Sequence, residues 1–288
     1  MMSPPFMPKH PVITAYPKIP EAFAEAEAMT VFLKGKGIDV SCGSLNDEEL
    51  RKRVKKGEFD MLIVVGGDGS VLRAGHLCAP SGVPILGVNL GRLGFLIQIE
   101  RREWHEYLEK LFNGEAWIEN RMMLRAEHFR AGEMLGSSNA LNEVVVARGQ
   151  NLRPVRLTAS VDGRRLTSYV ADGLIAATAT GSTAYALAAG GPILPPELRN
   201  ILLVPIAPHL SVDRAVVLSE GASVSIVINS ENSVLSVDGQ PPTPLTEDDH
   251  VDVTAADVSA QFVRFGDPGY FYRNITAHMN ENSLGFPR

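Results

Sequence analysis

Features that would restrict the function of this chain to several common classes are scarce or missing. The 288 residues include only two cysteines, Cys42 and Cys78, which form no CxxC pair, and no histidine has zinc-ligand spacing. This is typical of a protein of the reducing cytosol and gives no support to a structural metal site. The formal net charge is −6, so the chain lacks the basic excess that favours nucleic acid or an anionic membrane.

Long hydrophobic runs of the membrane-spanning kind are missing as well. Residues 173–196 contain no charge, but they are rich in Gly, Ser, Thr and Pro rather than in Leu and Ile, which argues against a membrane span. The first eleven residues contain four prolines and no apolar run, so we expect no signal peptide. The sequence therefore predicts a cytoplasmic protein without a membrane partner.

The first part of the chain alternates between strand-like and helix-like segments. Strands are expected at residues 12–16, 38–40, 61–65 and 84–89, and helices at residues 19–34, 46–56, 70–77 and 103–112. Strict alternation of this kind predicts a parallel, right-handed βαβ sheet with ligands at the carboxyl ends of its strands.

From about residue 121 the pattern changes to short alternating strands separated by turn signals. Residues 155–161 and 164–170 flank Asp162-Gly163, which is typical of a tight hairpin. We therefore expect an α/β N-terminal domain with a parallel sheet over residues 1–120, and a mostly antiparallel all-β domain over residues 121–265. The tail, residues 266–288, is aromatic and mixed, and we expect it to pack back on the first domain.

The stretch that points most directly to chemistry is Gly66-Gly67-Asp68-Gly69-Ser70, between an apolar strand and a helix. A strand, a glycine loop and a helix together present backbone N–H groups to an anion, usually phosphate. Asp68 would repel phosphate, so it needs another role, such as accepting a proton from a hydroxyl or holding a metal. Capping the following amides in an Asx-type turn is the structural alternative. The GGDG motif occurs in kinases of sugars, lipids and nucleotides, so it indicates phosphoryl transfer without a substrate.

Two further stretches do not read as ordinary strands. Leu141-Asn142-Glu143 places an amide and a carboxylate before an apolar run, and residues 178–185 place four hydroxyls and Tyr185 around one glycine. Small hydroxyl residues can bind a base or a ribose, and a tyrosine offers a stacking face. A helix cap or a turn explains each stretch equally well when it is taken alone.

Together these motifs resemble the NAD kinase family. The resemblance rests on GGDGS (66–70), NLGRLGFL (89–96), LNE (141–143), TGSTAY (180–185), GGP (190–192), Pro208-His209 and Asp238-Gly239. They occur in family order over roughly residues 60 to 240. Three alanines depart from the family pattern: Ala179 replaces the usual proline, and Ala186 and Ala188 replace common serines.

The resemblance implies a kinase that transfers the γ-phosphate of ATP, or a phosphate of polyphosphate, to the 2′-hydroxyl of the adenosine ribose of NAD. Mg²⁺ or another divalent metal would arrive on the nucleotide rather than on protein ligands. The product would be NADP, and the protein would be a homodimer or a homotetramer. A GGDG-type kinase of another hydroxyl substrate, a lipid or a sugar phosphate, is the first alternative. A non-catalytic NAD-binding regulator is the second, and the intact Asp68 argues against it.

The resemblance also implies roles for individual residues. Asp68 would be catalytic, as the base or orienting acceptor for the ribose hydroxyl. The residues implied in phosphate or nucleotide binding are Gly66, Gly67, Gly69, Ser70 and Arg73. The residues implied in NAD binding are Asn142, Glu143, Asp172, Thr180, Thr183, Ala184 and Tyr185, with Asp172 toward the nicotinamide.

Overall fold

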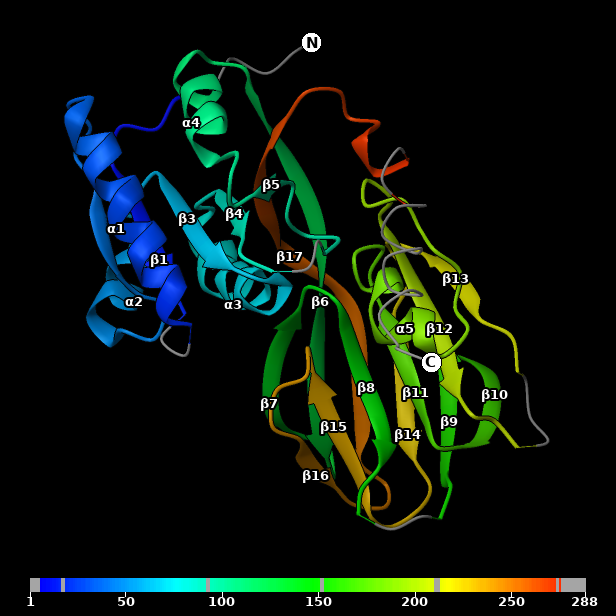
Figure 1. Ribbon diagram of the computed structural model, residues 1–288. Coiled ribbons are helices and arrows are strands. Elements are labelled where there is room, and N and C mark those ends of the chain that lie inside the picture. The colour runs from blue at the N-terminus through cyan, green and yellow to red at the C-terminus, as the bar shows by residue number, and fades with distance from the viewer. Residues whose placement is uncertain are drawn as a thin grey trace, which may run out of the picture. The chain divides into compact units, whose positions relative to one another are not determined.

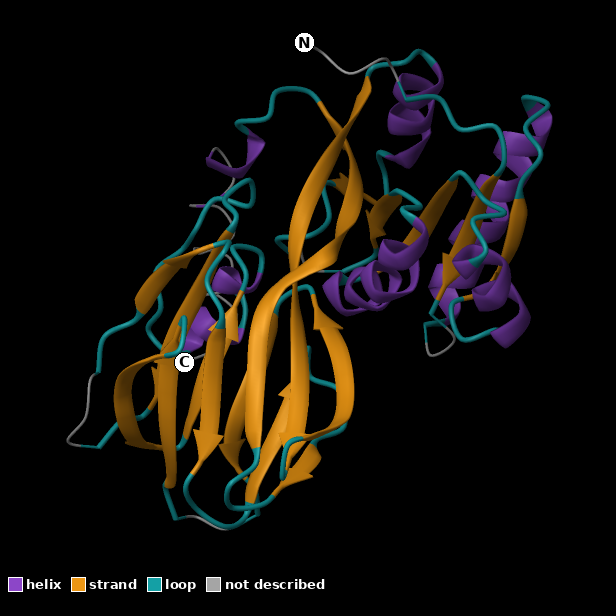
Figure 2. Cartoon of the chain, turned by 180° about the vertical axis from the view of Figure 1, so that it is seen from behind, coloured by secondary structure: helices purple, strands orange, loops and turns teal. Residues whose placement is uncertain are grey.

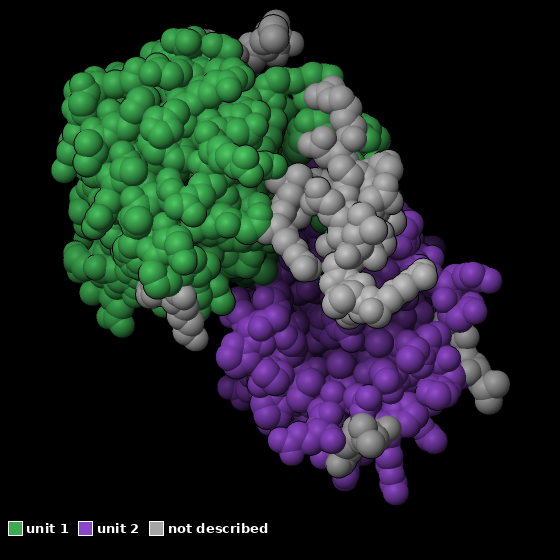
Figure 3. Space-filling view, viewed as in Figure 1, with its two compact units in different colours: residues 1–120, 259–288 green, residues 121–258 purple. Residues whose placement is uncertain are grey.

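A computed structural model describes residues 6–16, 19–91, 94–150, 153–209, 213–272 and 275. The chain divides into two compact units, coloured separately in Figure 3. Unit 1 consists of residues 1–120 and 259–288, and unit 2 consists of residues 121–258. Two long strands, β6 (Ala116–Arg130) and β17 (His250–Phe265), each contain one of the two boundaries.

Unit 1 contains a parallel sheet with strand order β4-β3-β1-β2. Figure 1 labels β4, β3 and β1 of this sheet. The end of β17 and the short β5 pair with β4, also in parallel. The strands are β1 (Pro11–Ala15), β2 (Ser41–Ser44), β3 (Met61–Gly66), β4 (Ile85–Asn89) and β5 (Ile99–Glu100). The helices are α1 (Pro20–Gly35), α2 (Glu48–Lys55), α3 (Asp68–Cys78) and α4 (Trp104–Phe112), with a 3₁₀ turn η1 (Ala79–Ser81) after α3.

The local sequence explains most of these elements. All of β3 is buried, as its unbroken apolar run predicts for a parallel sheet. The α2 helix starts where the Asp47 carboxylate accepts hydrogen bonds from the amides of Glu49 (2.9 Å) and Leu50 (3.0 Å), which is ordinary N-capping. One predicted strand is misplaced: Val40 is buried in the core of unit 1, but pairing with β1 falls on residues 41–44.

Unit 2 is built from two antiparallel sheets (Figure 2). The first has the order β10-β9-β14-β17, with β6 beside β17 and β7 beside β6, and the second has the order β13-β12-β11-β8-β15-β16. Strands of the first sheet not yet given are β7 (Glu133–Ala140), β9 (Val155–Val161), β10 (Arg164–Ala171) and β14 (Val224–Ile228). Those of the second are β8 (Glu143–Arg148), β11 (Gly173–Ala177), β12 (Asn200–Ile206), β13 (Val216–Ser219), β15 (Ser233–Val237) and β16 (Thr243–Leu245).

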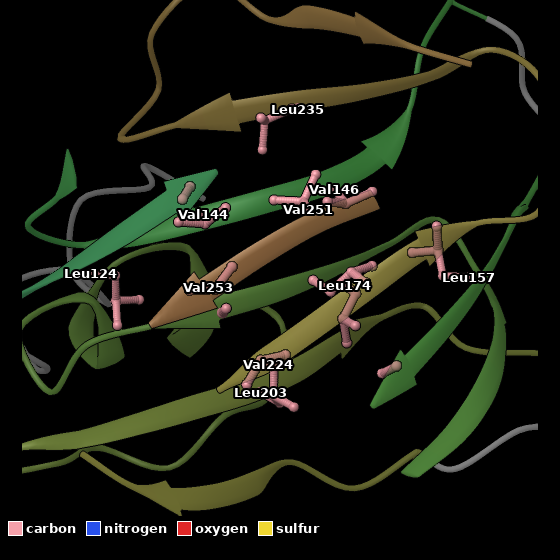
Figure 4. Close-up of a cluster of buried hydrophobic side chains, with 14 of the residues drawn as sticks. Leu124, Val144, Val146, Leu157, Leu174, Leu203, Val224, Leu235, Val251 and Val253 are labelled. Carbon is pink, nitrogen blue, oxygen red and sulfur yellow. The ribbon is translucent and has the colours of Figure 1, made fainter. Parts of the chain in front are cut away.

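One hydrophobic core joins the two sheets of unit 2. Leu157 and Val224 come from the first sheet and Leu174 and Leu203 from the second, and all four are fully buried (Figure 4). The predicted hairpin at Asp162-Gly163 is confirmed, since both residues have positive φ (51° and 72°) and the strands on either side pair. This geometry suits an Asp-Gly turn between antiparallel strands.

A buried carboxylate ties the turn before β17 to β6. Asp249 is fully buried and accepts hydrogen bonds from the Arg130 guanidinium at 2.8 and 2.9 Å. The Thr246 amide and hydroxyl also donate to it, and the His128 Nε2 atom lies 2.9 Å away. The Arg130 contact is the main reason that the pKa of Asp249 lies well below its usual range.

The predicted fold class is confirmed: unit 1 is α/β with a mostly parallel sheet, and unit 2 is antiparallel β. The described start of the tail packs on unit 1, where the Trp117 indole donates to the Gly266 carbonyl at 2.9 Å and Tyr270 is buried. Residues 276–288 lie outside the described residues. Within the described ranges, no helix is both long enough and apolar enough to cross a membrane.

Candidate functional site

The glycine loop joins the end of β3 to the start of α3 in unit 1. Gly66 is required by packing, because a Cβ there would lie 2.6 Å from the Ser70 Oγ atom. Ser70 is buried, and its amide donates to the Gly67 carbonyl at 2.8 Å. The loop is therefore closed tightly from the inside, and α3 begins at Asp68 with its N-terminus at the carboxyl end of a sheet strand.

Gly67 and Gly69 have no such reason to be glycine within the chain. Apart from adjoining residues and the backbone of α3 itself, no heavy atom of the described chain would lie within 4 Å of a Cβ on either, and neither has a positive φ. The space beside both glycines is therefore open. Open space at a helix N-terminus is where a phosphate can approach backbone amides closely.

The Asp68 carboxylate is held by the second glycine-bearing motif of unit 1. It accepts hydrogen bonds from the Phe95 amide at 2.8 Å and from the Leu96 amide at 3.3 Å. Gly94 allows this approach, because a Cβ there would overlap the Asp68 carboxylate. The GGDGS and NLGRLGFL motifs thus meet at Asp68, although Arg92 and Leu93 lie outside the described residues. These donors are 27 and 28 residues further along the chain, so they are not those of a local Asx-type turn.

Arg73 lies one turn along α3 and is exposed. Its guanidinium carbon lies 4.6 Å from the centre of the Tyr16 ring, a cation–π arrangement. It remains a candidate for phosphate binding, because one face and the free N–H groups of a stacked guanidinium can still bind an anion.

In unit 2, Asp238 fixes the turn that carries Asn142 and Glu143. Its carboxylate accepts hydrogen bonds from the amides of Leu141, Asn142 (2.9 Å) and Glu143 (2.8 Å). Asp238 has a positive φ of 49° and is buried. The sequence indicated Asp238-Gly239 only as a family motif. Its carboxylate faces residues almost a hundred positions away, and no local pattern shows such a contact.

The TGSTAY segment folds against the same turn. The Thr178 hydroxyl donates to the Leu141 carbonyl (2.6 Å) and accepts from the Gly181 amide (3.0 Å). A Cβ on Gly181 would overlap the Asn142 carbonyl, so glycine is required. The hydroxyls of Ser182 and Thr183 donate to backbone carbonyls within the segment. Three of the four hydroxyls predicted to face a ligand therefore first shape the loop.

Tyr185 and Glu143 lie at the same turn. Tyr185 begins α5 (Tyr185–Ala188), which follows the 3₁₀ turn η2 (Gly181–Thr183), and is 44% exposed. Glu143 is 8% exposed, and within the described chain its Oε2 atom has no hydrogen-bond partner. Burial, and then the negative charge of Asp238, raise the pKa of Glu143 to about 7, against a hydrogen bond from the Tyr185 amide. An unpaired carboxyl oxygen beside an exposed ring suits a polar, aromatic ligand.

Asp172 lies at the other end of β11 from Thr178 and forms an ion pair with Arg148 at 3.0 Å. Thr178 is six positions further along the extended chain, or roughly 20 Å away. Asn142, Glu143, Thr180, Thr183, Ala184 and Tyr185 are therefore brought together in unit 2, but Asp172 is not among them. The loop residues Gly66, Gly67, Asp68, Gly69 and Ser70 form a second group in unit 1.

Comparison with known proteins identifies the family. The family model described as the ATP-NAD kinase N-terminal domain matches residues 21–116, and that of the ATP-NAD kinase C-terminal domain matches residues 141–265. An NAD kinase of Heliobacterium modesticaldum is 44% identical over 225 residues, which is 77% of this chain and 79% of the relative. This chain belongs to the NAD kinase family.

Other members of the NAD kinase family agree with this assignment. An NAD kinase of Chloroflexus aggregans is 42% identical over 226 residues, 78% of this chain and 82% of the relative. Yeast NADH kinase complexed with NADH has a TM-score of 0.81 at 26% identity, covering 98% of this chain and 90% of that one. An Archaeoglobus fulgidus NAD kinase in complex with ATP has a TM-score of 0.74 at 25% identity, covering 94% and 98%. The alternative of a lipid or sugar-phosphate kinase has no support from these comparisons.

Proposed function

We propose that this chain transfers the γ-phosphate of ATP to the 2′-hydroxyl of the adenosine ribose of NAD, giving NADP. The observation that carries the proposal is the Asp68 carboxylate, held by two amides beside two glycines with open space around them. Phosphoryl transfer requires mainly positioning and charge neutralisation. The loop offers backbone amides to the phosphate charge and a carboxylate that can orient the hydroxyl. The relatives named NAD kinase, and the solved complexes with NADH and ATP, support the choice of substrates.

Unit 1 would provide the phosphate loop and Asp68, whose carboxylate would accept a hydrogen bond from the ribose hydroxyl. The amides at the start of α3 would face the phosphates of ATP, which brings Mg²⁺ as part of the substrate. A carboxylate has about four lone-pair sites, so Asp68 can accept a hydrogen bond from the ribose hydroxyl while it holds the amides of Phe95 and Leu96. Its role would be to orient that hydroxyl and to accept its proton as the new oxygen–phosphorus bond forms and the bond from the γ-phosphorus to ADP breaks.

Unit 2 would hold the adenosine part of NAD. The exposed ring of Tyr185 would stack on the base, and the unpaired Glu143 oxygen would bind a hydroxyl or an amino group. Asn142 is oriented by the Asp238 carboxylate through its own amide. Thr180, Thr183 and Ala184 would form the wall of the pocket, since their segment is fixed to the Asn142 turn by Thr178.

We further propose that the protein is a cytoplasmic homo-oligomer in which Asp172 serves the NAD of a neighbouring subunit. Its distance of roughly 20 Å from Thr178 along β11 keeps it away from the residues on the adenosine side. The strands β13 and β16 end the second sheet of unit 2, and Val217 on β13 is 49% exposed, so sheet edges are available for a subunit contact. Polyphosphate is the other donor to be tried.

The test is a coupled assay for NADP, run with Mg²⁺ and with ATP or polyphosphate as donor. A lipid and a sugar phosphate serve as competing acceptors. We expect NADP formation, little phosphorylation of the other acceptors, and a fall in kcat of about 10²- to 10⁴-fold for Asp68→Asn with the affinity for NAD kept. Well-folded protein that makes no NADP with either donor would contradict the proposal, and turnover of Asp68→Asn close to the parent would return Asp68 to a structural role.

A further inference from the structure

A buried arginine grips the turn that holds Asp68. Arg264, near the end of β17, is 2% exposed. Its Nη1 atom donates to the Leu96 carbonyl at 2.9 Å, and its Nε atom donates to the Glu119 carboxylate at 2.8 Å. The amide of the same Leu96 donates to Asp68. The two polar backbone atoms of one residue therefore connect the candidate catalytic carboxylate to a guanidinium inside unit 1.

The surroundings of Arg264 fix its orientation. The Tyr270 hydroxyl donates to both oxygens of Glu119 at 3.3 Å, and Glu119 is itself buried. The rings of Phe262 and Tyr270 lie 4.9 and 5.2 Å from the guanidinium carbon. The neighbouring Phe265 is held by Gln98 through hydrogen bonds in both directions. The guanidinium is thus anchored on one side by a carboxylate and on its faces by aromatic rings.

Stability alone does not account for this arrangement. A buried ion pair is often replaced by well-packed apolar residues without loss of stability, and within the described chain the Nη2 atom of Arg264 has no hydrogen-bond partner. What a guanidinium does provide is a rigid, planar fork that can bind two acceptors at once. Here those acceptors are Glu119 and the Leu96 carbonyl.

We propose that Arg264 is a positioning residue for Asp68, acting through the backbone of Leu96. This inference rests on the proposed function, because it assumes that Asp68 receives the ribose hydroxyl. By holding the Leu96 carbonyl, Arg264 sets where the Leu96 and Phe95 amides point, and those amides orient the Asp68 carboxylate. Loss of the hydrogen bond from Arg264 to the Leu96 carbonyl lets the carboxylate rotate away from the hydroxyl. It removes no group that binds NAD or ATP.

The experiment compares Arg264→Lys, Asp68→Asn and the double variant by steady-state kinetics. Lysine keeps the charge, but it lacks the planar fork that binds both acceptors. We expect Arg264→Lys to lower kcat by about 10- to 100-fold, as a displaced catalytic group does, while the KM values for NAD and ATP change little. If Arg264 acts through Asp68, adding Arg264→Lys to Asp68→Asn lowers kcat little further, because effects of coupled groups are not additive.

A second variant covers the case in which a lysine at this buried position disturbs folding. Arg264→Met combined with Glu119→Gln removes both charges and keeps an acceptor for the Tyr270 hydroxyl, so it should fold and show the same loss of kcat. Arg130→Lys, which perturbs the buried carboxylate Asp249 in unit 2, is the matched control and should lower the melting temperature without lowering kcat of the folded enzyme.

Four outcomes separate the ideas. Parent-like kcat in a folded Arg264 variant would overturn the positioning role, and so would fully additive losses in the double variant with Asp68→Asn. Near-parent turnover by Asp68→Asn alone would instead remove the assumption about Asp68, and with it this inference. No NADP formation by the parent would contradict the proposed function itself.

Discussion

At the scale of single residues, some atoms of the candidate site are already occupied by contacts within the protein and others are not. Gly94 and Gly181 are each fixed by a polar group that would overlap a Cβ, namely the Asp68 carboxylate and the Asn142 carbonyl. Both glycines thus support candidate site residues from the side, and neither needs to touch a ligand. Glu143 is the opposite case, since one of its oxygens is buried and unpaired within the described chain. Ionising this buried carboxyl group without a partner for that oxygen costs stability.

This cost predicts a pH dependence. Because the pKa of Glu143 is raised from 4.5 to about 7 in the folded chain, the folded state keeps a proton that the unfolded state has lost between those pH values. The contribution to stability is fully present below about pH 4.5 and is lost as pH rises through 7. The loss amounts to about 3 kcal/mol of unfolding free energy.

Glu143→Gln tests this prediction, because glutamine keeps the shape and cannot ionise. Denaturant unfolding of both proteins at pH 5 and at pH 8 gives the change in unfolding free energy with pH. We expect the unfolding free energy to fall less from pH 5 to pH 8 in the variant than in the parent, since the other titrating groups are shared. An identical change in both proteins would show that Glu143 does not titrate in this range.

At the scale of elements, the strand-loop-helix unit β3–α3 could be predicted and its contacts could not. The apolar run, the glycines and the helix restart are local signals, and each appears in the structure. The bond from Asp68 to the turn at residues 94–96 depends on a segment almost thirty residues later, so no local pattern announces it. The same holds for Asp238, and for Arg264, which is a single arginine in an otherwise ordinary strand.

Two interpretations from residue type also differ from the contacts that the structure shows. The apolar residues at 38–40 suggested a strand, but their side chains fill the core of unit 1 while the less apolar residues 41–44 pair at the sheet edge. The hydroxyls at residues 178–183 suggested a ligand surface, and most of them bind the backbone of their own loop. In both cases the residue types were informative, but only the fold determines which neighbours these residues contact.

The glycine loop permits a matched pair of substitutions. Gly69 lies in the first turn of α3 with open space beside it, and alanine favours a helix by up to about 1 kcal/mol. Gly69→Ala should therefore keep or raise the melting temperature, while its methyl group occupies the space assigned to phosphate. We expect the KM for ATP to rise about tenfold, equivalent to about 1.4 kcal/mol.

Gly66→Ala is the control for that substitution, because its Cβ would lie 2.6 Å from the Ser70 hydroxyl. It should lower the melting temperature, which Gly69→Ala should not. Calorimetry and steady-state kinetics on the two variants give both quantities. Unchanged ATP kinetics in a stable Gly69→Ala variant would mean that phosphate does not approach this side of the loop.

At the scale of the whole molecule, the position of Asp172 predicts cooperation between subunits. If Asp172 serves the NAD of a neighbour, Asp172→Ala and Asp68→Asn are defects that different subunits can contribute to one oligomer. Co-expression of the two variants should then restore activity above that of either variant alone, because some pockets receive an intact residue from each chain. Light scattering at micromolar concentration should show an oligomer. A fully active monomer, or no restoration in a demonstrated mixed oligomer, would refute this arrangement.

The two strands that contain the unit boundaries have a further consequence. Because β6 and β17 pair, the chain enters unit 2 and leaves it on neighbouring strands. Unit 2 is one continuous segment of the chain with unit 1 on both sides of it, so an exchange with its ends at the two boundaries would replace it whole. The order of the phosphate loop, its supporting turn and the sheet behind them stays unbroken in such an exchange. A lineage of kinases can in this way acquire a new acceptor while it inherits the same phosphoryl chemistry.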